Sequence, residues 1–336
     1  MKLPSGLEIE KNAPLAPFTS WLVGGSADHL ALPKTIDELK EAVAYGKAAG
    51  LPITILGGGT NVLVSDKGVR GLVIALRKLA GSQLKIENGR ARIECLAGTS
   101  KSELLKTFLK QKLEPALFLA GLPGDVGGGI VMNAGVGEKM VPREFVEITD
   151  WIEVLRWDGA EQDLRSVSTT NGLGGSKVNE FISEGQVLAA AASMRLERIE
   201  AKALQWSYRH CEGWRPGIIA RVGISWPLEP KEDILPRVKQ ANQVRLSKQP
   251  LDMPSCGSVF INPPGHTSGR LIEQSGLKGF AVGGAKVSEK HANFIVNFEK
   301  ANALDIHQVI EHVKKTVREK QGVELRTEVV YLGEWG

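Results

Sequence analysis

Cysteine is scarce in this chain of 336 residues, which contains only Cys95, Cys211 and Cys256. An odd number of widely spaced cysteines does not fit a disulfide framework and favours reduced thiols in the cytoplasm. The sequence has neither a Cys-x-x-Cys nor a His-Glu-x-x-His motif, so nothing in it supports a zinc site. We therefore expect a cytoplasmic protein that binds no metal.

Long hydrophobic runs and blocks of like charge are also missing. No stretch approaches the length of a transmembrane span, and prolines and charges interrupt residues 1–18 where a signal peptide needs an apolar core. The 42 basic and 38 acidic residues leave a net charge of +4 without a basic tract. This composition argues against membrane and nucleic-acid partners, whereas the small positive excess suits an anionic small ligand.

Glycine, in contrast, is concentrated in two clusters. Residues 121–137, GLPGDVGGGIVMNAGVG, contain seven glycines, and residues 56–66, LGGGTNVLVSD, follow a short β-branched run. Neither cluster matches the dinucleotide fingerprint G-x-G-x-x-G before a helix, and no P-loop motif occurs. A run of tight turns explains either cluster alone. Because glycine lets backbone N–H groups approach a phosphate closely, the two together predict a site for one large phosphate-bearing ligand.

Local patterns predict both helices and strands. Thr35 and Ser100 each precede a glutamate by three residues, the capping-box spacing at which helices begin. A further helix is expected at 301–321, with its apolar residues on one face and Gly322 ending it. Strands are expected at 53–56, 62–64, 72–76, 92–96, 151–157, near 187–196 and at 323–332. We place a domain boundary near 200–215, ahead of a charged helical stretch and a proline-rich loop.

Three residues could carry chemistry, although each has a simpler explanation. Arg209 in Ser-Tyr-Arg could form an ordinary surface salt bridge. Ser258 lies in CGSVFINPP, which does not resemble G-x-S-x-G, so it could be a turn serine rather than a hydrolase nucleophile. Glu328 interrupts the last expected strand, where a glutamate usually faces solvent. The histidines are scattered, and only His291 lies in a dense mixture of polar and apolar residues.

Seven segments, taken in order over almost the whole chain, closely resemble the MurB family, the UDP-N-acetylenolpyruvoylglucosamine reductases of bacterial peptidoglycan synthesis. Any one of these motifs could arise by chance, but the ordered set is specific. The segments are WLVGGSADHLALP (21–33), LGGGTNVLVSD (56–66), GLPGDVGGGIVMNAG (121–135), SYRH (207–210), CGSVFINPPG (256–265), GRLIEQSGLKGFAVGGAKVSEKHANFIVN (269–297) and LRTEVVYLG (325–333).

The resemblance implies an α+β fold with noncovalent FAD in a domain of the vanillyl-alcohol-oxidase (PCMH) type. This domain would span residues 1–200 as two subdomains split near residue 75. A substrate-binding α+β domain would span 201–336, with its last strand returning toward the FAD domain. NADPH would be the co-substrate, and we expect a monomer.

The resemblance also assigns roles to single residues. Ser258 is similar to the family's proton donor, and Arg209 and Glu328 are similar to its other two catalytic positions. The substrate would contact Asn262, which is similar to an asparagine that holds the diphosphate, together with Tyr208 and His291. The expected FAD-binding residues are Gly57, Gly58, Gly59, Thr60, Asn61, Gly121, Pro123, Gly124, Gly127, Gly128 and Asn133.

The implied reaction is the formation of UDP-N-acetylmuramate by NADPH-dependent reduction of an enolpyruvyl ether. Ile261 stands where the family usually has lysine, which removes one cation near the diphosphate, and the few tyrosines favour the form that lacks a tyrosine lid. A flavin oxidase or dehydrogenase acting on another sugar or hydroxy acid is an alternative. A flavin- or sugar-nucleotide-binding regulator is a third class, although retention of Arg209, Ser258 and Glu328 argues against it.

Overall fold

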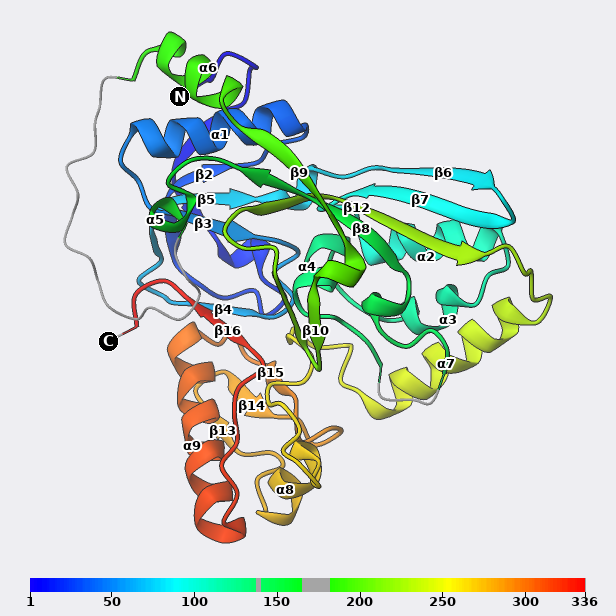
Figure 1. Cartoon of the computed structure of the whole chain (residues 1–336). Helices are drawn as coiled ribbons and strands as arrows, with labels where there is room; N and C mark the ends of the chain where they lie inside the picture. Colours follow the sequence, from blue (N-terminus) through cyan, green and yellow to red (C-terminus); the bar gives the residue numbers. More distant parts are fainter. Residues whose placement is uncertain (137–139, 165–181, 336) are drawn as a thin grey trace.

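The computed structural model describes residues 1–136, 140–164 and 182–335 of the chain. Two larger sheets and their helices form the upper part of the molecule in Figure 1, and a smaller C-terminal unit lies below them. The chain passes from the first large sheet to the second between Ala75 and Ser82. The mixture of helices with parallel and antiparallel strands confirms the α+β class.

The first sheet is mostly parallel. Parallel strands need crossover connections, and helix α1 (Ile36–Ala48) provides one, between the second and third strands of this sheet in sequence order. The side chain of Thr35 accepts the N–H of Glu38, so this helix begins as its capping-box spacing predicts. In spatial order the strands are β1 (Ile9–Pro14), β2 (Ser26–Ala31), β5 (Val69–Ala75) and β3 (Ile53–Leu56).

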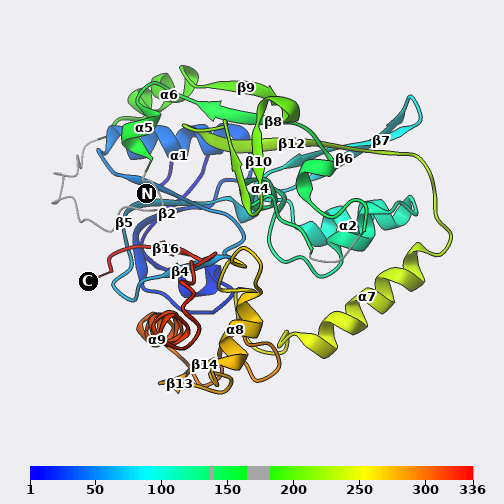
Figure 2. The ribbon, with the colours of Figure 1, turned by 60° about the horizontal axis from the view of Figure 1, so that its bottom comes forward.

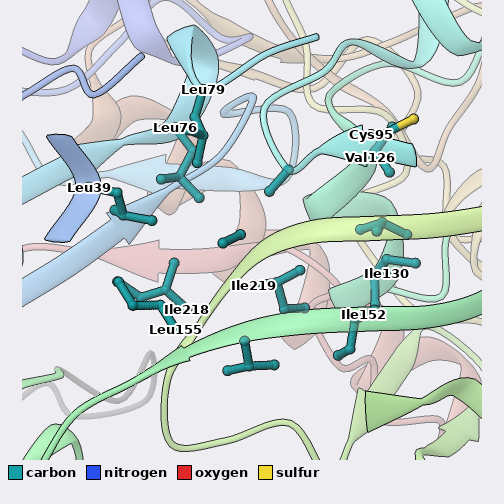
Figure 3. Packing of buried hydrophobic residues seen from close by; sticks show 14 of the residues in the cluster. Leu39, Leu76, Leu79, Cys95, Val126, Ile130, Ile152, Leu155, Ile218 and Ile219 are labelled. Atoms are coloured by element: carbon teal, nitrogen blue, oxygen red, sulfur yellow. The ribbon is translucent and has the colours of Figure 1, made fainter. Parts of the chain in front are cut away.

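The second sheet is antiparallel and carries helix α4 (Val126–Val131) against two of its strands. Figure 3 shows Val126 and Ile130 of this helix close to Cys95, Ile152 and Ile219, which are all buried. Burying each aliphatic side chain of this size contributes about 1.5–3 kcal/mol, so the contact fixes α4 on the sheet. The strands, in spatial order, are β6 (Ser82–Glu87), β7 (Arg90–Leu96), β12 (Ile218–Pro227), β8 (Thr149–Arg156) and β9 (Arg195–Glu200).

The remaining helices of this part flank the two sheets. Helix α2 (Lys101–Lys110) begins at Ser100, whose side chain accepts the N–H of Glu103 as predicted, and it packs on α3 (Pro115–Leu119). Helix α6 (Glu184–Ala192) packs on α1, and α5 (Ala160–Asp163) is a single turn. Short 3₁₀ turns occupy Ala16–Phe18, Leu76–Lys78, Phe145–Glu147 and Ala201–Ala203.

Two sequence-based expectations are wrong here. The strand expected near 187–196 is mostly helix α6, because the capping box at Ser183 and the alanine run that follows favour helix, and β9 begins only at Arg195. The boundary expected at residue 200 falls inside the first part of the molecule. Strand β12 lies between β7 and β8, so residues 218–227 complete the second sheet instead of opening a new domain.

The C-terminal unit has a hydrophobic core of its own. Helix α9 (Ala303–Gln321) buries Ile306, Ile310 and Val313 in it and ends at Gly322, which has a φ of 67°, as predicted. A three-stranded sheet of β13 (Ala281–Val282), β14 (Ala285–Val287) and β15 (Ile295–Asn297) packs on α9, as does α8 (Ser268–Gln274). Helix α7 (Ile234–Lys248) contacts α3 and leads into this unit (Figure 2).

The end of the chain joins the two parts. Strand β16 (Val330–Leu332) pairs in parallel with β4 (Val62–Val64), which lies within the glycine cluster of residues 56–66, just after its glycines. The strand expected at 323–332 is thus shorter than predicted. Ahead of β16, the described part of this segment forms one isolated β-bridge, between Thr327 and Phe260. Among the helices that the structure describes, none has the length and apolar composition needed to cross a bilayer.

Candidate active site

The two glycine clusters meet as facing turns. A Cβ atom added to Gly58 would lie 2.9 Å from the Cα of Gly124, and one added to Gly124 would lie 2.7 Å from Oγ1 of Thr60. Real Cβ atoms do not approach backbone so closely, and Gly124 also has a φ of 90°. Glycine is therefore required at the contact between the turns, although they are more than sixty residues apart in the sequence.

Asp125 fixes the second glycine turn along the chain, that of residues 121–129, at the start of α4. Its Oδ1 accepts the N–H of Gly128 at 2.7 Å, and a Cβ added to Gly57 in the facing turn would lie 2.8 Å from its Oδ2. Burial raises the pKa of this carboxyl group, whereas the N–H of Gly128 and the charge of Lys101 act in the opposite direction. The carboxylate thus occupies the gap between the turns.

A cavity of about 1960 Å³ opens over these turns and extends to the C-terminal unit. Its volume is roughly twice the upper end of the range usual for one small-molecule site, so it can hold a cofactor and a substrate together. The predicted residues that border it are Gly57, Gly58, Gly59, Thr60, Asn61, Pro123, Gly127, Gly128, Tyr208, Arg209, Ser258, Asn262, His291 and Glu328. Gly121, Gly124 and Asn133 are not among the lining residues.

Asn133 has a different place from the one expected. It is buried, its Oδ1 accepts the N–H of Val146, and its Nδ2 donates to Glu144 and to the carbonyl oxygen of Ser207, all at 3.1 Å. These bonds hold the hairpin of β10 (Gln205–Ser207) and β11 (His210–Glu212) against the second glycine turn. Asn133 therefore supports the hairpin rather than facing a ligand.

Arg209 lies at the tip of that hairpin and reaches across to the C-terminal unit. Its Nε is 3.3 Å from Oε1 of Glu328, its Nη2 donates to the carbonyl oxygen of Gly135, and both charged side chains are only about 15% exposed. The φ of Arg209 is 58°, a left-handed conformation that costs a non-glycine residue about 1–3 kcal/mol. Such strain persists where surrounding contacts fix the residue, as the ion pair and the carbonyl do here.

Ser258 and Glu328 come from adjacent extended segments. The N–H of Glu328 donates to the carbonyl oxygen of Val259, the residue after Ser258, at 2.8 Å. From the first glycine cluster, Nδ2 of Asn61 donates to the carbonyl oxygen of Glu328 at 2.9 Å. Asn61 therefore fixes the position of the catalytic candidates relative to the glycine turns.

Burial and the ion pair act in opposite directions on the carboxyl group of Glu328. Burial raises the pKa of Glu328, and the positive charge of Arg209 and its hydrogen bond act in the opposite direction. A carboxylate held between these two influences keeps the guanidinium group in one orientation. The other N–H donors of Arg209 remain available to a bound anion.

The three expected substrate-binding residues also border the cavity. Oδ1 of Asn262 accepts the N–H of Ser268, which leaves its amide NH₂ as the group that can donate to a ligand. Tyr208 is half exposed, with the guanidinium of Arg209 over its ring. Nδ1 of His291 accepts the N–H of Asn293, and burial lowers the pKa of His291 below its usual value. A neutral His291 thus carries its proton on Nε2, as a donor.

Sequence reasoning missed most of the cations in the cavity wall. Ile261, which stands where the family usually has lysine, is not among the lining residues, but several lysines and arginines from elsewhere in the chain are. Those on α7 recur at the spacing of one helical face, a signal that could have been found in the sequence. The cationic lining residues, in addition to Arg209, are Lys101, Arg215, Arg237, Arg245, Lys248, Arg270, Lys278 and Lys290.

Comparison with known proteins assigns this arrangement to a class. The profile of an FAD binding domain matches residues 27–165, over most of the first sheet, both glycine turns and part of the second sheet. The profile of the UDP-N-acetylenolpyruvoylglucosamine reductase C-terminal domain matches residues 249–332. The fold and the site therefore define a flavin-binding oxidoreductase, which confirms the FAD-binding prediction.

Full-length relatives narrow the class to a family. The chain is 36% identical to the UDP-N-acetylenolpyruvoylglucosamine reductase of Listeria innocua, over 98% of this chain and 96% of the relative. It is also 36% identical to the enzyme of that name from Moorella thermoacetica, over 99% and 97%. The chain belongs to the UDP-N-acetylenolpyruvoylglucosamine reductase family.

A solved structure supports the same conclusion. The crystal structure of UDP-N-acetylenolpyruvylglucosamine reductase (MurB) from Thermus caldophilus superposes with a TM-score of 0.68 at 28% sequence identity. The match covers 97% of this chain and 98% of the other, so it includes both parts of the molecule. The family resemblance seen in the sequence is thereby confirmed.

Proposed function

We propose that this protein reduces the enolpyruvyl ether of UDP-N-acetylglucosamine to UDP-N-acetylmuramate, with NADPH as the electron donor. The observation that carries the proposal is the convergence of Arg209, Ser258 and Glu328 on the cavity that the glycine turns border. These residues come from two separate parts of the fold. Their meeting place therefore lies between a cofactor cradle and a second binding region.

The residues present fit FAD. The facing turns leave no room for a Cβ at Gly58 or Gly124, and their backbone lies open to a cavity rich in cations. Backbone N–H groups of this kind, with the N-terminus of α4 beside them, suit a diphosphate. Gly57–Asn61 and Gly127–Gly128 would hold the cofactor, which when bound supplies a hydride to the enolpyruvyl methylene carbon.

Arg209 would stabilise the negative charge that develops on the substrate carboxylate during this transfer. Its guanidinium group is already fixed by Glu328 and by the carbonyl oxygen of Gly135, so it needs little reorganisation when the charge appears. Preorganised donors of this kind contribute about 3 kcal/mol to the stabilisation of a transition state. Glu328 would act by orienting the guanidinium and polarising the site.

Ser258 would deliver a proton to the substrate α-carbon, which completes the lactyl ether. A serine hydroxyl is a weak acid at neutral pH, so it can serve only a strongly basic carbon, such as that of an enolate. Two observations support this role: Ser258 borders the same cavity as Arg209, and the N–H of Glu328 donates to the carbonyl oxygen of Val259, the residue after Ser258.

The substrate diphosphate would lie in the C-terminal part of the cavity. The amide of Asn262, the Nε2–H of His291 and the side chains of Arg270 and Lys290 provide neutral and charged donors there. We further propose that the enzyme acts as a monomer in the cytoplasm. A reducing compartment suits its three cysteines, which are all buried and unpaired.

An anaerobic two-step experiment tests the function. Purified holoprotein should show flavin absorbance that NADPH bleaches and that UDP-N-acetylglucosamine enolpyruvate restores, with the substrate recovered with two added hydrogens by mass spectrometry. Bleaching by an alcohol or a hydroxy acid, without turnover of the enolpyruvyl compound, would refute the proposal in favour of an oxidase or dehydrogenase of another substrate.

A further inference from the structure

Lys101 is a buried lysine in the wall of the cavity, and the proposed reaction does not use it. It is the first residue of α2, is only 5% exposed, and borders the same cavity as Gly127 and Gly128. A positive charge at a helix N-terminus opposes the helix dipole, and a buried charge loses hydration. Local propensity and burial therefore both disfavour lysine at this position.

The backbone around Lys101 is fastened to the second glycine turn. The N–H of Lys101 donates to the carbonyl oxygen of Gly124 at 3.0 Å, and the N–H of Val126 donates to the carbonyl oxygen of Thr99 at 2.9 Å. The side chain runs beneath α4, where a Cβ added to Gly129 would lie 3.0 Å from its Cε. Its position is therefore fixed relative to the turn that faces the ligand.

The ammonium group has no hydrogen-bond acceptor among the residues that the structure describes. Its nearest described partner is the ring of Phe145, whose centroid lies 5.5 Å from Nζ. No described residue forms a hydrogen bond or an ion pair with Nζ, and Asp125, the carboxylate that acts on it electrostatically, lies beyond ion-pair distance. Arg209 and Arg245 add positive charge nearby, and burial lowers the pKa of Lys101 to about 8. A nearly buried cation that no described residue hydrogen-bonds therefore borders the cavity.

We propose that Lys101 is a further cofactor-binding residue, whose ammonium group contacts a negative charge of the bound flavin dinucleotide. This inference rests on the FAD site of the proposed function. The cofactor carries negative charge on its diphosphate in both redox states and on its ring system when reduced. Either charge would supply the acceptor that the described part of the chain does not provide.

The test compares Lys101→Met with Lys106→Met in the full-length protein. Lys106 is exposed on the same helix and outside the cavity, so its substitution removes an equal charge without touching the site. Two quantities are measured for each variant: the dissociation constant of FAD from the apoprotein and the midpoint potential of the bound flavin. Lys101→Gln, which retains polarity, is the second variant if the methionine variant folds poorly.

If Lys101 contacts the diphosphate, Lys101→Met should weaken FAD binding roughly 10- to 100-fold, because charged hydrogen bonds are of that strength, and the midpoint potential should stay unchanged. If Lys101 instead contacts the reduced ring, Lys101→Met should leave the affinity for oxidised FAD unchanged. It should then lower the midpoint potential by about 30 mV for each tenfold loss of affinity for the reduced flavin. Either result supports the proposal, provided that Lys106→Met has the wild-type dissociation constant and the wild-type midpoint potential. Wild-type values in folded Lys101 variants would overturn it, whereas failure of the wild type to bind FAD would refute the proposed function itself.

Discussion

Ser258→Ala should separate catalysis from stability. Ser258 borders the cavity, and no described residue forms a hydrogen bond with its hydroxyl group. Its removal therefore leaves no buried group unpaired, and the free energy of unfolding should change by less than about 0.5 kcal/mol. The loss should fall on the proton transfer alone.

The expected loss of rate follows from that role. A positioned proton donor accelerates a step by roughly 10²- to 10⁴-fold, or about 3–5 kcal/mol of activation free energy. Reduction of the flavin by NADPH needs no proton from Ser258, so its rate should remain near that of the wild type. Reoxidation by the enolpyruvyl substrate should slow by two to four orders of magnitude.

Anaerobic stopped-flow absorbance measures the two steps separately. Ser275→Ala is the matched control, because Ser275 is buried, donates to the carbonyl oxygen of Leu271 at 2.8 Å and lies away from the cavity. This control should lose about 1 kcal/mol of stability and keep both rates. If Ser258→Ala slowed both steps equally, or reoxidised at the normal rate, the assignment of Ser258 as proton donor would be wrong.

Three further changes have expected outcomes. Glu328→Gln should impair the second step and spare flavin reduction, because it removes the charge that orients Arg209; unchanged turnover would exclude Glu328 from the site. Gly58→Ala should abolish FAD binding measured by fluorescence titration, because its Cβ would push the facing turn away, whereas Gly185→Ala, with open space at its Cβ, should bind normally. Burial lowers the pKa of Lys101 from 10.5 to about 8, so the charged form destabilises the ligand-free fold. Lys101→Met should therefore raise apoprotein stability below pH 8 by up to roughly 3 kcal/mol, and this gain should vanish as the pH rises from 8 to 10.5; equal stability curves would contradict the burial of that charge.

Local signals in the sequence predicted the elements whose determinants are local. The helix that begins after Thr35 and the one that ends at Gly322 depend on residues within a turn or two, and both form where expected. The strand expected near 187–196 was wrong because an alanine-rich stretch was interpreted without weighing its capping box at Ser183. The boundary at 200 was wrong because the partners of β12 lie far away in the sequence, where no local pattern records them.

The sequence also supplied most of the candidate site, but not the arrangement within it. The ordered motifs identified Arg209, Ser258 and Glu328 as a set through the family resemblance, and the structure brings them to one cavity. Asn133 was assigned to the cofactor because it lies in a glycine-rich motif, yet its side chain is used entirely within the protein. Lys101 was overlooked because nothing in its neighbours in the sequence indicates burial.

The sequence by itself determined where the backbone can approach a ligand closely, because glycine lacks a Cβ atom at any position. It also determined the family. Only the tertiary structure decided that Gly58 meets Gly124, that Arg209 pairs with Glu328 and that Lys101 borders the cavity with no acceptor from residues 1–136, 140–164 or 182–335. The physical reason is that these contacts join segments brought together by sheet pairing and by burial of distant apolar side chains. Their energies depend on distances and desolvation, which exist only in the folded chain.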